Sequence, residues 1–162
     1  MPRPAPPIEA AEWLNAPEPV RLTDLAGKVV CIVFLQRLCP GCSHYALPQA
    51  RRVAETFTSG EVVVLGVHSV FEHHEQQSDR AGLARWLTDN GCRFPVAVDA
   101  PSETTTAPRT MTAYNLQGTP SLVLVDRQGR MRTRRFGPVS DMQLGAEIMA
   151  LLLERQLAFA AS

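Results

Sequence analysis

A nearly continuous apolar segment at residues 28–35 (KVVCIVFL) is the feature that most constrains how this chain folds. Unbroken apolar and β-branched residues predict a strand that is buried on both faces, as in a parallel sheet. After the next turn, residues 43–57 contain few strand-forming residues and place Tyr45, Leu47 and Val53 where one face of a helix would bury them. The chain is therefore expected to pass from a buried strand into a helix.

Two cysteines, Cys39 and Cys42, lie at this strand-to-helix turn, in the sequence LCPGC at residues 38–42. Free backbone N–H groups and the helix dipole at a helix N-terminus favour a thiolate over a thiol, which makes Cys39 the expected nucleophile. A spacing of two residues lets Cys42, on the first helical turn, reach back and form a disulfide with Cys39. The pair predicts thiol–disulfide exchange in which Cys39 attacks and Cys42 resolves.

Other uses of a CxxC pair stay open. Zinc needs four ligands, and the chain has no second CxxC and no HxxxH-type pair to complete a site. The run EHHE at residues 72–75, near His68, is interpreted as a surface loop, because adjacent histidines do not share a face of a helix or strand. A static disulfide or two inert thiols are the remaining alternatives. We expect no metal and no cofactor; Cys31 is interpreted as a core residue and Cys92 as partly exposed.

The composition fits one globular domain. With 162 residues, 45% of them hydrophobic, the chain can bury a sizeable core without a metal or a disulfide. Its 16 basic and 16 acidic residues cancel, so no nucleic-acid partner is expected, and the five arginines from Arg127 to Arg135 are interpreted as a solvated hairpin face. No stretch approaches the roughly 20 apolar residues of a membrane span, and residues 1–7 (MPRPAPP) lack the apolar region of a signal peptide. The expected location is the cytoplasm, without membrane contact.

Strand and helix patterns alternate along the rest of the chain. A Pro-rich leader at residues 1–12 is expected to precede a single domain at residues 13–160. Further strands are predicted at residues 61–68, 94–99, 121–125 and 130–136. The last two are expected to pair as a hairpin, and the strand at residues 94–99 is expected near a sheet edge because it contains a proline. Helices are predicted at residues 80–90, at residues 109–115 and from Ser140 or Asp141 onward, with a polar loop at residues 72–79. The order predicts an α/β protein whose mixed sheet has helices on both faces.

Three motifs give the chain a family resemblance. The CPGC at the end of a buried strand, the GTP at residues 118–120 and the hairpin sequence VLVDRQG at residues 123–129 resemble a thioredoxin-fold protein. The extra strand and helix between residues 68 and 115, with LTDLAGKVV at residues 22–30, are similar to the redoxin branch. That branch contains TlpA-like thiol–disulfide oxidoreductases and the alkyl hydroperoxide reductase/thiol-specific antioxidant proteins. The resemblance implies a thioredoxin-like three-layer sandwich around a mixed central sheet.

The resemblance also implies roles for particular residues. Cys39 would be the exposed nucleophile and Cys42 the buried resolving thiol, while Thr119 and Pro120 would be joined by a cis peptide bond packed against the disulfide. The backbone of Thr119 would then be free to pair with an extended substrate strand. The implied partners are protein or small-molecule thiols and disulfides, together with an unidentified electron donor or acceptor.

Three positions depart from the family pattern. Val33 stands six residues ahead of Cys39, where thioredoxins carry a buried aspartate that takes part in proton transfer. Leu38 replaces the aromatic residue that many relatives have before the first cysteine, and His44 lies where TlpA-like members often have a glutamate. His44 is a candidate auxiliary residue that would accept a proton or supply a positive charge. An exposed position on the helix surface is the alternative for His44.

A thiol peroxidase with antioxidant activity is the second functional hypothesis. Peroxiredoxins place their reactive cysteine in the motif P-x-x-x-T-x-x-C. Counting back from Cys39 puts Gln36 at the threonine position and Ile32 at the proline position, and counting back from Cys42 puts Cys39 and Leu35 there. Neither register matches, although an accessible thiolate is open to oxidation by peroxide. A non-enzymatic module that binds a metal or a partner is the third hypothesis.

The C-terminal helix carries an apolar run that exceeds what one helix face buries. Three consecutive leucines, Leu151 to Leu153, point in different directions around a helix. They predict either a homodimer contact or packing beneath the N-terminal leader.

Overall fold

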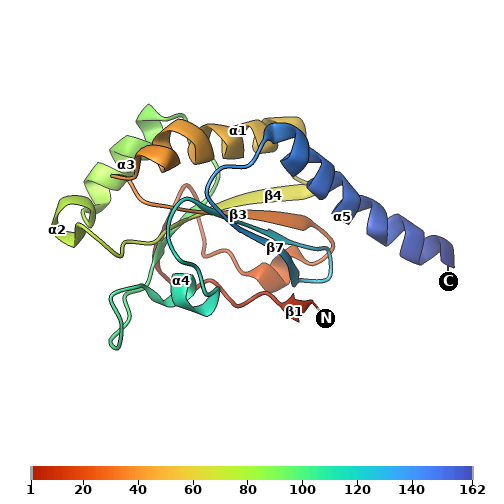
Figure 1. Ribbon diagram of the computed structural model, residues 1–162, viewed down its shortest axis with the longest axis horizontal. Coiled ribbons are helices and arrows are strands. Elements are labelled where there is room, and N and C mark those ends of the chain that lie inside the picture. Colours follow the sequence, from red (N-terminus) through yellow and green to blue (C-terminus); the bar gives the residue numbers. More distant parts are fainter. Residues whose placement is uncertain (1, 162) are drawn as a thin grey trace.

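The computed structural model describes residues 2–161, with side chains over residues 2–154. Seven strands form one sheet in the order β1-β7-β6-β3-β4-β5-β2 (Figure 1). The strands β3, β4 and β5 run parallel to one another, and the other neighbouring pairs are antiparallel, so the predicted mixed sheet is confirmed. The strands are β1 (Arg3–Pro4), β2 (Ala10–Leu14), β3 (Val29–Leu35), β4 (Val62–His68), β5 (Val96–Asp99), β6 (Ser121–Val125) and β7 (Arg130–Phe136).

The central strand β3 is buried along its whole length, as its apolar sequence predicts. It pairs in parallel with β4, with Leu35 opposite His68, and antiparallel with β6. Successive side chains of a strand point to opposite faces, so each face of β3 needs its own apolar layer. One apolar cluster contains Val29, Cys31, Val33 and Leu35, and the other contains Val30, Ile32 and Phe34.

Helices cover both faces of the sheet, as predicted. In Figure 1, α1, α3 and α5 lie along one face and α4 lies on the other. On the α4 face, Tyr114 packs against Phe34 with ring centroids 5.3 Å apart. No helix within residues 2–161 is both long enough and apolar enough to cross a membrane. The helices are the 3-10 helix η1 (Leu22–Leu25), the π-helix η2 (Cys42–Ala46), α1 (Leu47–Thr56), α2 (His74–Gln77), α3 (Arg80–Asp89), α4 (Arg109–Ala113) and α5 (Asp141–Ala161).

The N-terminal segment supplies both edges of the sheet. Strand β1 pairs antiparallel with β7, and β2 pairs antiparallel with β5. The sequence predicts only a Pro-rich leader over residues 1–12, so these pairings are a difference from the expectation. Proline lacks a backbone N–H and is tolerated on an edge strand, where that group would face solvent. The Tyr114 hydroxyl also donates a hydrogen bond to the Pro6 carbonyl, at 2.8 Å, which fixes the segment between the two strands.

Two further details differ from the sequence-based expectations. The polar loop at residues 72–79 contains the short helix α2, whose four residues are too few to produce a helical pattern in the sequence. Strand β5 lies inside the sheet, because β2 pairs on its outer side. The proline that suggested an edge position, Pro95, precedes β5, and its carbonyl accepts from the Gly66 N–H of β4 at 2.9 Å, so its missing N–H does not prevent pairing.

The helix α5 packs along the same face as α1 and α3. Leu151 and Leu152 are buried in the cluster that contains Cys31, and Leu153 is half exposed. Two leader residues, Ala5 and Ile8, pack instead against the cluster on the opposite face. The prediction that the leucine run packs beneath the leader is therefore wrong, and a homodimer contact stays a proposal.

Candidate active site

The two cysteines of the CPGC sequence lie where β3 passes into the first helical segment, which confirms the predicted strand-to-helix turn. Cys42 begins the π-helix η2, which continues directly into α1. The backbone N–H of Cys42 donates to the Cys39 sulfur at 3.3 Å. The backbone N–H groups of Cys42 and Ser43 also donate to the Cys39 carbonyl, at 3.1 and 3.2 Å. Cys39 therefore lies at the amino end of the helical segment, where N–H groups converge on it.

The two sulfurs have different surroundings. Cys39 is half-buried, whereas Cys42 is completely buried. Burial, together with a hydrogen bond to Cys39, raises the pKa of the Cys42 thiol far above its ordinary value. The backbone N–H of Gln36 opposes this shift by donating to the Cys42 sulfur at 3.4 Å. One sulfur is thus accessible to a partner molecule and the other is reached only from within the protein.

The loop at Thr119 and Pro120 lies directly beside the cysteines. The peptide bond between these two residues is cis, as the family resemblance implies. The Cys39 thiol donates to the Thr119 carbonyl at 3.6 Å. Gly41 approaches the proline ring so closely that a Cβ atom on it would lie 3.2 Å from Pro120 Cδ. The structure thus brings together four predicted site residues, Cys39, Cys42, Thr119 and Pro120.

Two buried glutamines at this site were missed by the sequence-based reasoning. The Gln36 side chain donates to Thr119 Oγ1 at 3.0 Å, and its amide oxygen accepts from Gln77 Nε2 at 2.9 Å. Gln77 lies on α2, and its own amide oxygen accepts from the Leu38 N–H at 3.1 Å. Each glutamine is only 1% exposed. The one available signal is a polar residue, Gln36, immediately after an otherwise apolar strand.

His68 contacts the same turn from the end of β4. Its Nε2 atom accepts from the Arg37 N–H at 3.1 Å, so this imidazole is neutral. Burial, with a smaller contribution from the Arg37 charge, lowers the pKa of His68 to about 4. The Arg37 side chain pairs with Asp79, the residue that caps the start of α3, at 2.9 Å.

The remaining sequence candidates lie apart from this arrangement. His44 is exposed on η2, which matches the alternative of a surface position, and its auxiliary role stays a prediction. Cys31 and Cys92 are both buried, and burial raises the pKa of each thiol to about 12. The expectation that Cys92 is partly exposed is therefore wrong. Among the side chains that the structure describes, at residues 2–154, no three His, Cys, Asp or Glu residues gather as a metal site would require.

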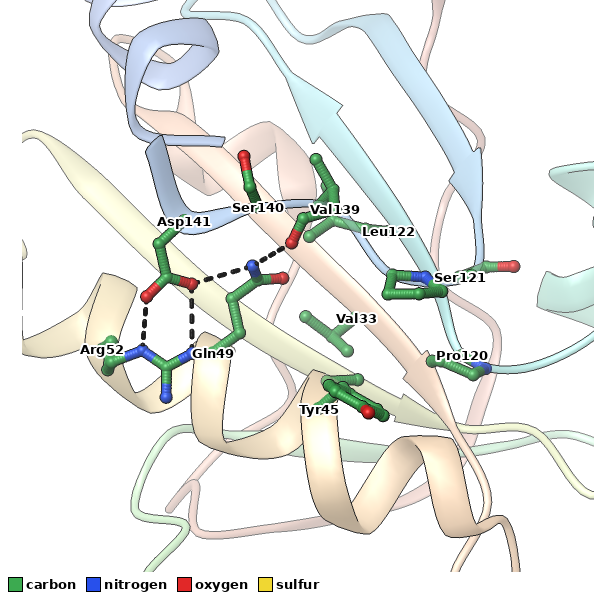
Figure 2. A pocket seen from close by; sticks show the side chains of 13 residues that line it. Val33, Tyr45, Gln49, Arg52, Pro120, Ser121, Leu122, Val139, Ser140 and Asp141 are labelled. Atoms are coloured by element: carbon green, nitrogen blue, oxygen red, sulfur yellow. Dashed lines mark hydrogen bonds and ion pairs between the residues drawn. The ribbon is translucent and has the colours of Figure 1, made fainter. Parts of the chain in front are cut away.

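A cavity of about 240 Å³ adjoins Pro120 and separates the first helical segment from the loop that leads into α5 (Figure 2). Its inner wall is apolar and includes Val33, Pro120 and Leu122, and Tyr45 stands at its rim. At the opposite end, Arg52 pairs with Asp141 at 2.7 Å. Gln49 closes that end by donating to the Val139 carbonyl at 2.7 Å and to Asp141 at 3.0 Å. The position of Val33, which replaces the aspartate of thioredoxins, is therefore part of an apolar cavity wall.

Comparison with solved structures places this fold among known ones. A thioredoxin-like superfamily protein superposes with a TM-score of 0.89 at 44% identity, covering 93% of this chain and 96% of that one. A thiol-disulfide isomerase from Corynebacterium glutamicum superposes with a TM-score of 0.86 at 43% identity, covering 91% and 96%. The thioredoxin-like fold implied by the sequence is confirmed.

Comparison of sequences gives the family. Protein DipZ of Mycobacterium bovis is 28% identical over 127 residues, which make up 77% of this chain. The chain spans only 17% of the length of DipZ. The family model described as the AhpC/TSA family matches residues 2–134. Since this match covers well over half of the sequence, the chain belongs to the AhpC/TSA family.

Proposed function

We propose that this protein is a thiol–disulfide oxidoreductase in which Cys39 is the nucleophile and Cys42 the resolving thiol. The observation that carries the proposal is the pairing of a half-buried sulfur with a completely buried one, joined by the 3.3 Å contact between the Cys42 N–H and the Cys39 sulfur. The solved relative at 43% identity, described as a thiol-disulfide isomerase, supports the same reaction class. A reductant and an oxidant use the same chemistry in opposite directions, and the reduction potential of the pair decides between them.

The exchange proceeds in two steps. The Cys39 thiolate attacks one sulfur of a substrate disulfide, the substrate S–S bond breaks, and its second sulfur leaves as a thiolate that takes a proton. Cys42 then loses its proton and attacks the Cys39 sulfur of the mixed disulfide, which releases the other substrate sulfur as a thiol. The substrate gains two electrons, and the protein is left with a Cys39–Cys42 disulfide. A dithiol donor restores the protein by the reverse steps.

Two features favour protein thiols and disulfides as substrates, with small thiols as the simpler alternative. The Thr119 carbonyl, which holds the Cys39 thiol, lies at the start of β6 beside the accessible sulfur, where an extended chain can pair with it. The apolar cavity next to Pro120 has room for a side chain of such a segment. The redox partner that supplies or removes electrons is unidentified, and the cytoplasm is the proposed compartment, where thiol systems keep dithiols reduced.

The test is turnover of a protein disulfide with a dithiol reductant. Cys39→Ser should lower the rate to background, and Cys42→Ser should trap a mixed disulfide that is visible as a covalent adduct. Cys92→Ala, which changes a buried thiol that bonds to the Phe94 carbonyl, serves as the control and should turn over at the wild-type rate. Turnover that survives Cys39→Ser, or wild-type turnover at the level of free cysteine, would overturn the proposal. Stoichiometric binding of a metal or a partner without turnover would favour the non-enzymatic module.

Membership in the AhpC/TSA family favours thiol peroxidase activity as a second candidate. In this chain the residue at the peroxiredoxin threonine position is Gln36, whose amide is buried and bonded to Thr119 and Gln77. The Gln36 side chain is buried and bonded within the protein, so it differs from the peroxide-binding threonine of peroxiredoxins. We expect Cys39-dependent peroxide consumption to be no faster than that of an ordinary accessible thiol, as measured with a dithiol as the electron donor.

A further inference from the structure

The amides of Gln36 and Gln77 form a buried hydrogen-bonded pair that joins three segments near the two sulfurs. Gln36 follows β3 and contacts Cys42 through its backbone and Thr119 through its side chain. Gln77, which lies 41 residues further along the chain, is held by Gln36 and accepts from the Leu38 N–H. Two loops and the helix α2 thus meet at a single pair of side chains.

Nearly every polar atom of the pair is used. The Gln36 amide oxygen accepts from the Phe71 N–H at 3.3 Å as well as from Gln77. The Gln77 amide nitrogen also donates to the Glu72 carbonyl at 2.6 Å. A buried amide that loses its partners costs free energy, so these bonds resist relative displacement of the segments that they join. The geometry around the sulfurs therefore depends on residues 71–77 as well as on the CPGC turn.

The hydrogen bond from Gln36 leaves the Thr119 hydroxyl able to donate. Because Gln36 Nε2 donates to Thr119 Oγ1, the hydroxyl hydrogen of Thr119 is left to bond elsewhere. The Thr119 side chain lowers the pKa of the Cys42 thiol, against the larger effect of burial. The Gln36 N–H donates to the same sulfur. Gln36 therefore acts on the Cys42 sulfur twice, through its own N–H and through the Thr119 side chain that its amide holds.

We propose that Gln36 and Gln77 are positioning residues for the resolving step, in which Cys42 attacks the mixed disulfide, and that α2 is part of the site because it carries Gln77. The inference rests on the proposed function, since it concerns the second of the two exchange steps. Donors at the Cys42 sulfur stabilise the negative charge that it must develop as it attacks. The first step depends on Cys39, whose own N–H donor comes from Cys42.

The test separates the two steps with the aromatic disulfide DTNB as the substrate. Attack by Cys39 releases a first thionitrobenzoate, and resolution by Cys42 releases a second, so the two phases report the two steps. Gln36→Met keeps the length of the side chain and removes its hydrogen bonds. We expect it to slow the second phase by about tenfold, the scale of one lost buried hydrogen bond, and the first phase by less than about threefold. Gln77→Met should act in the same direction.

The double variant Gln36→Met/Gln77→Met tests whether the pair acts as a unit. If it does, the second phase of the double variant should be no slower than that of Gln36→Met alone. Thr110→Val is the matched control, because it removes a buried hydroxyl on α4 whose hydrogen bonds, among the described residues, go to Glu9. Its two phases should keep their wild-type ratio, whatever its effect on thermal stability.

The outcomes distinguish the inference from the function on which it rests. If both variants slow the two phases equally, or leave both unchanged, the glutamines support only the fold and the inference is overturned. If wild-type protein releases no second thionitrobenzoate, the proposed function fails first. If Gln36→Met does not fold, Gln77→Met carries the same test, since Gln77 lies on the four-residue helix α2, outside the central strands. If the wild-type protein shows both phases and Gln77→Met leaves the ratio of their rates unchanged, the inference is overturned.

Discussion

Cys42 and Cys31 are both completely buried, yet they lie in regions of different chemistry. Cys31 lies in the middle of β3, and among the described residues no hydrogen bond reaches its sulfur. Cys42 lies beyond the end of the same sheet strand, receives the Gln36 N–H and contacts Cys39. Exposure therefore does not separate the core thiol from the proposed redox thiol. The supply of hydrogen-bond donors and an accessible neighbouring sulfur distinguish them.

The same contrast separates Cys39 from Cys92. Cys92 follows α3 and its thiol makes one long contact, 3.9 Å, with the Phe94 carbonyl. Cys39 lies among the backbone N–H groups that begin a helical segment and beside the Thr119 carbonyl. The four cysteines thus form a proposed reactive pair and two core residues. The pair differs from the core thiols because it lies where the chain turns from the end of β3 into a helical segment.

Selective alkylation is the prediction with the largest expected effect. Burial raises the pKa of Cys31 and of Cys92 to about 12, so at pH 8 only about one such thiol in 10⁴ is a thiolate. We expect iodoacetamide to label Cys39 in the reduced native protein at least about 1,000-fold faster than either of them, because those thiols are also inaccessible. Peptide mass mapping over time measures the rates. Equal labelling rates are expected for all four cysteines only in denaturant. Equal rates in the native protein would show that the reactive and core thiols do not differ.

The second prediction concerns His68, a buried group that borders the site. Its folded pKa of about 4 lies below the ordinary value of 6.5, so between these values the unfolded chain binds a proton that the folded protein does not. The stability that neutral His68 contributes is complete above pH 6.5 and is lost as the pH falls, by about 3 kcal/mol at pH 4. Urea unfolding at several pH values measures it. His68→Gln should flatten this part of the pH dependence, and an unchanged slope would show that His68 titrates normally.

The third prediction compares the two regions by the same substitution. Cys31→Ser puts a hydroxyl into an apolar cluster and should lower the free energy of unfolding by about 1–3 kcal/mol. Cys39→Ser changes a half-buried side chain and should lower it by less than about 0.5 kcal/mol, although it removes the proposed activity. Both values come from urea unfolding under reducing conditions. Equal losses would mean that Cys39 is as much a part of the core as Cys31.

The sequence predicted the parts of the fold whose residues carry a strong local pattern. Strands β3, β4 and β6 are apolar runs, and β7 completes a hairpin with β6. The predicted bounds of these four strands match the structure to within a residue. Strand β1 and helix α2 escaped prediction because two and four residues cannot show a period. The edge pairing of the N-terminal segment depends on distant partners, which no local pattern reveals.

The candidate site divides in the same way. The spacing of Cys39 and Cys42 is visible in the sequence, and Thr119 and Pro120 were identified through the family resemblance. The roles of these four residues stay a proposal. Gln36 and Gln77 were not found, because their significance comes from a hydrogen bond between residues 41 positions apart. Only the folded chain brings those amides to the sulfurs.

The smallest expected effect comes from two glycines, Gly145 within α5 and Gly41 immediately before η2. Gly145 lies within α5, and a Cβ on it would meet nothing within 4 Å, so Gly145→Ala should raise the free energy of unfolding by about 0.5–1 kcal/mol through helix propensity. A Cβ on Gly41 would lie 3.2 Å from Pro120 Cδ, which offsets that gain and shifts the proline beside Cys39. We therefore expect Gly41→Ala to leave stability nearly unchanged while it slows disulfide exchange, and Gly145→Ala to do the reverse. Parallel urea titrations and turnover assays of the two variants measure this, and the same response in both would mean that the close approach of Gly41 to Pro120 has no bearing on the site.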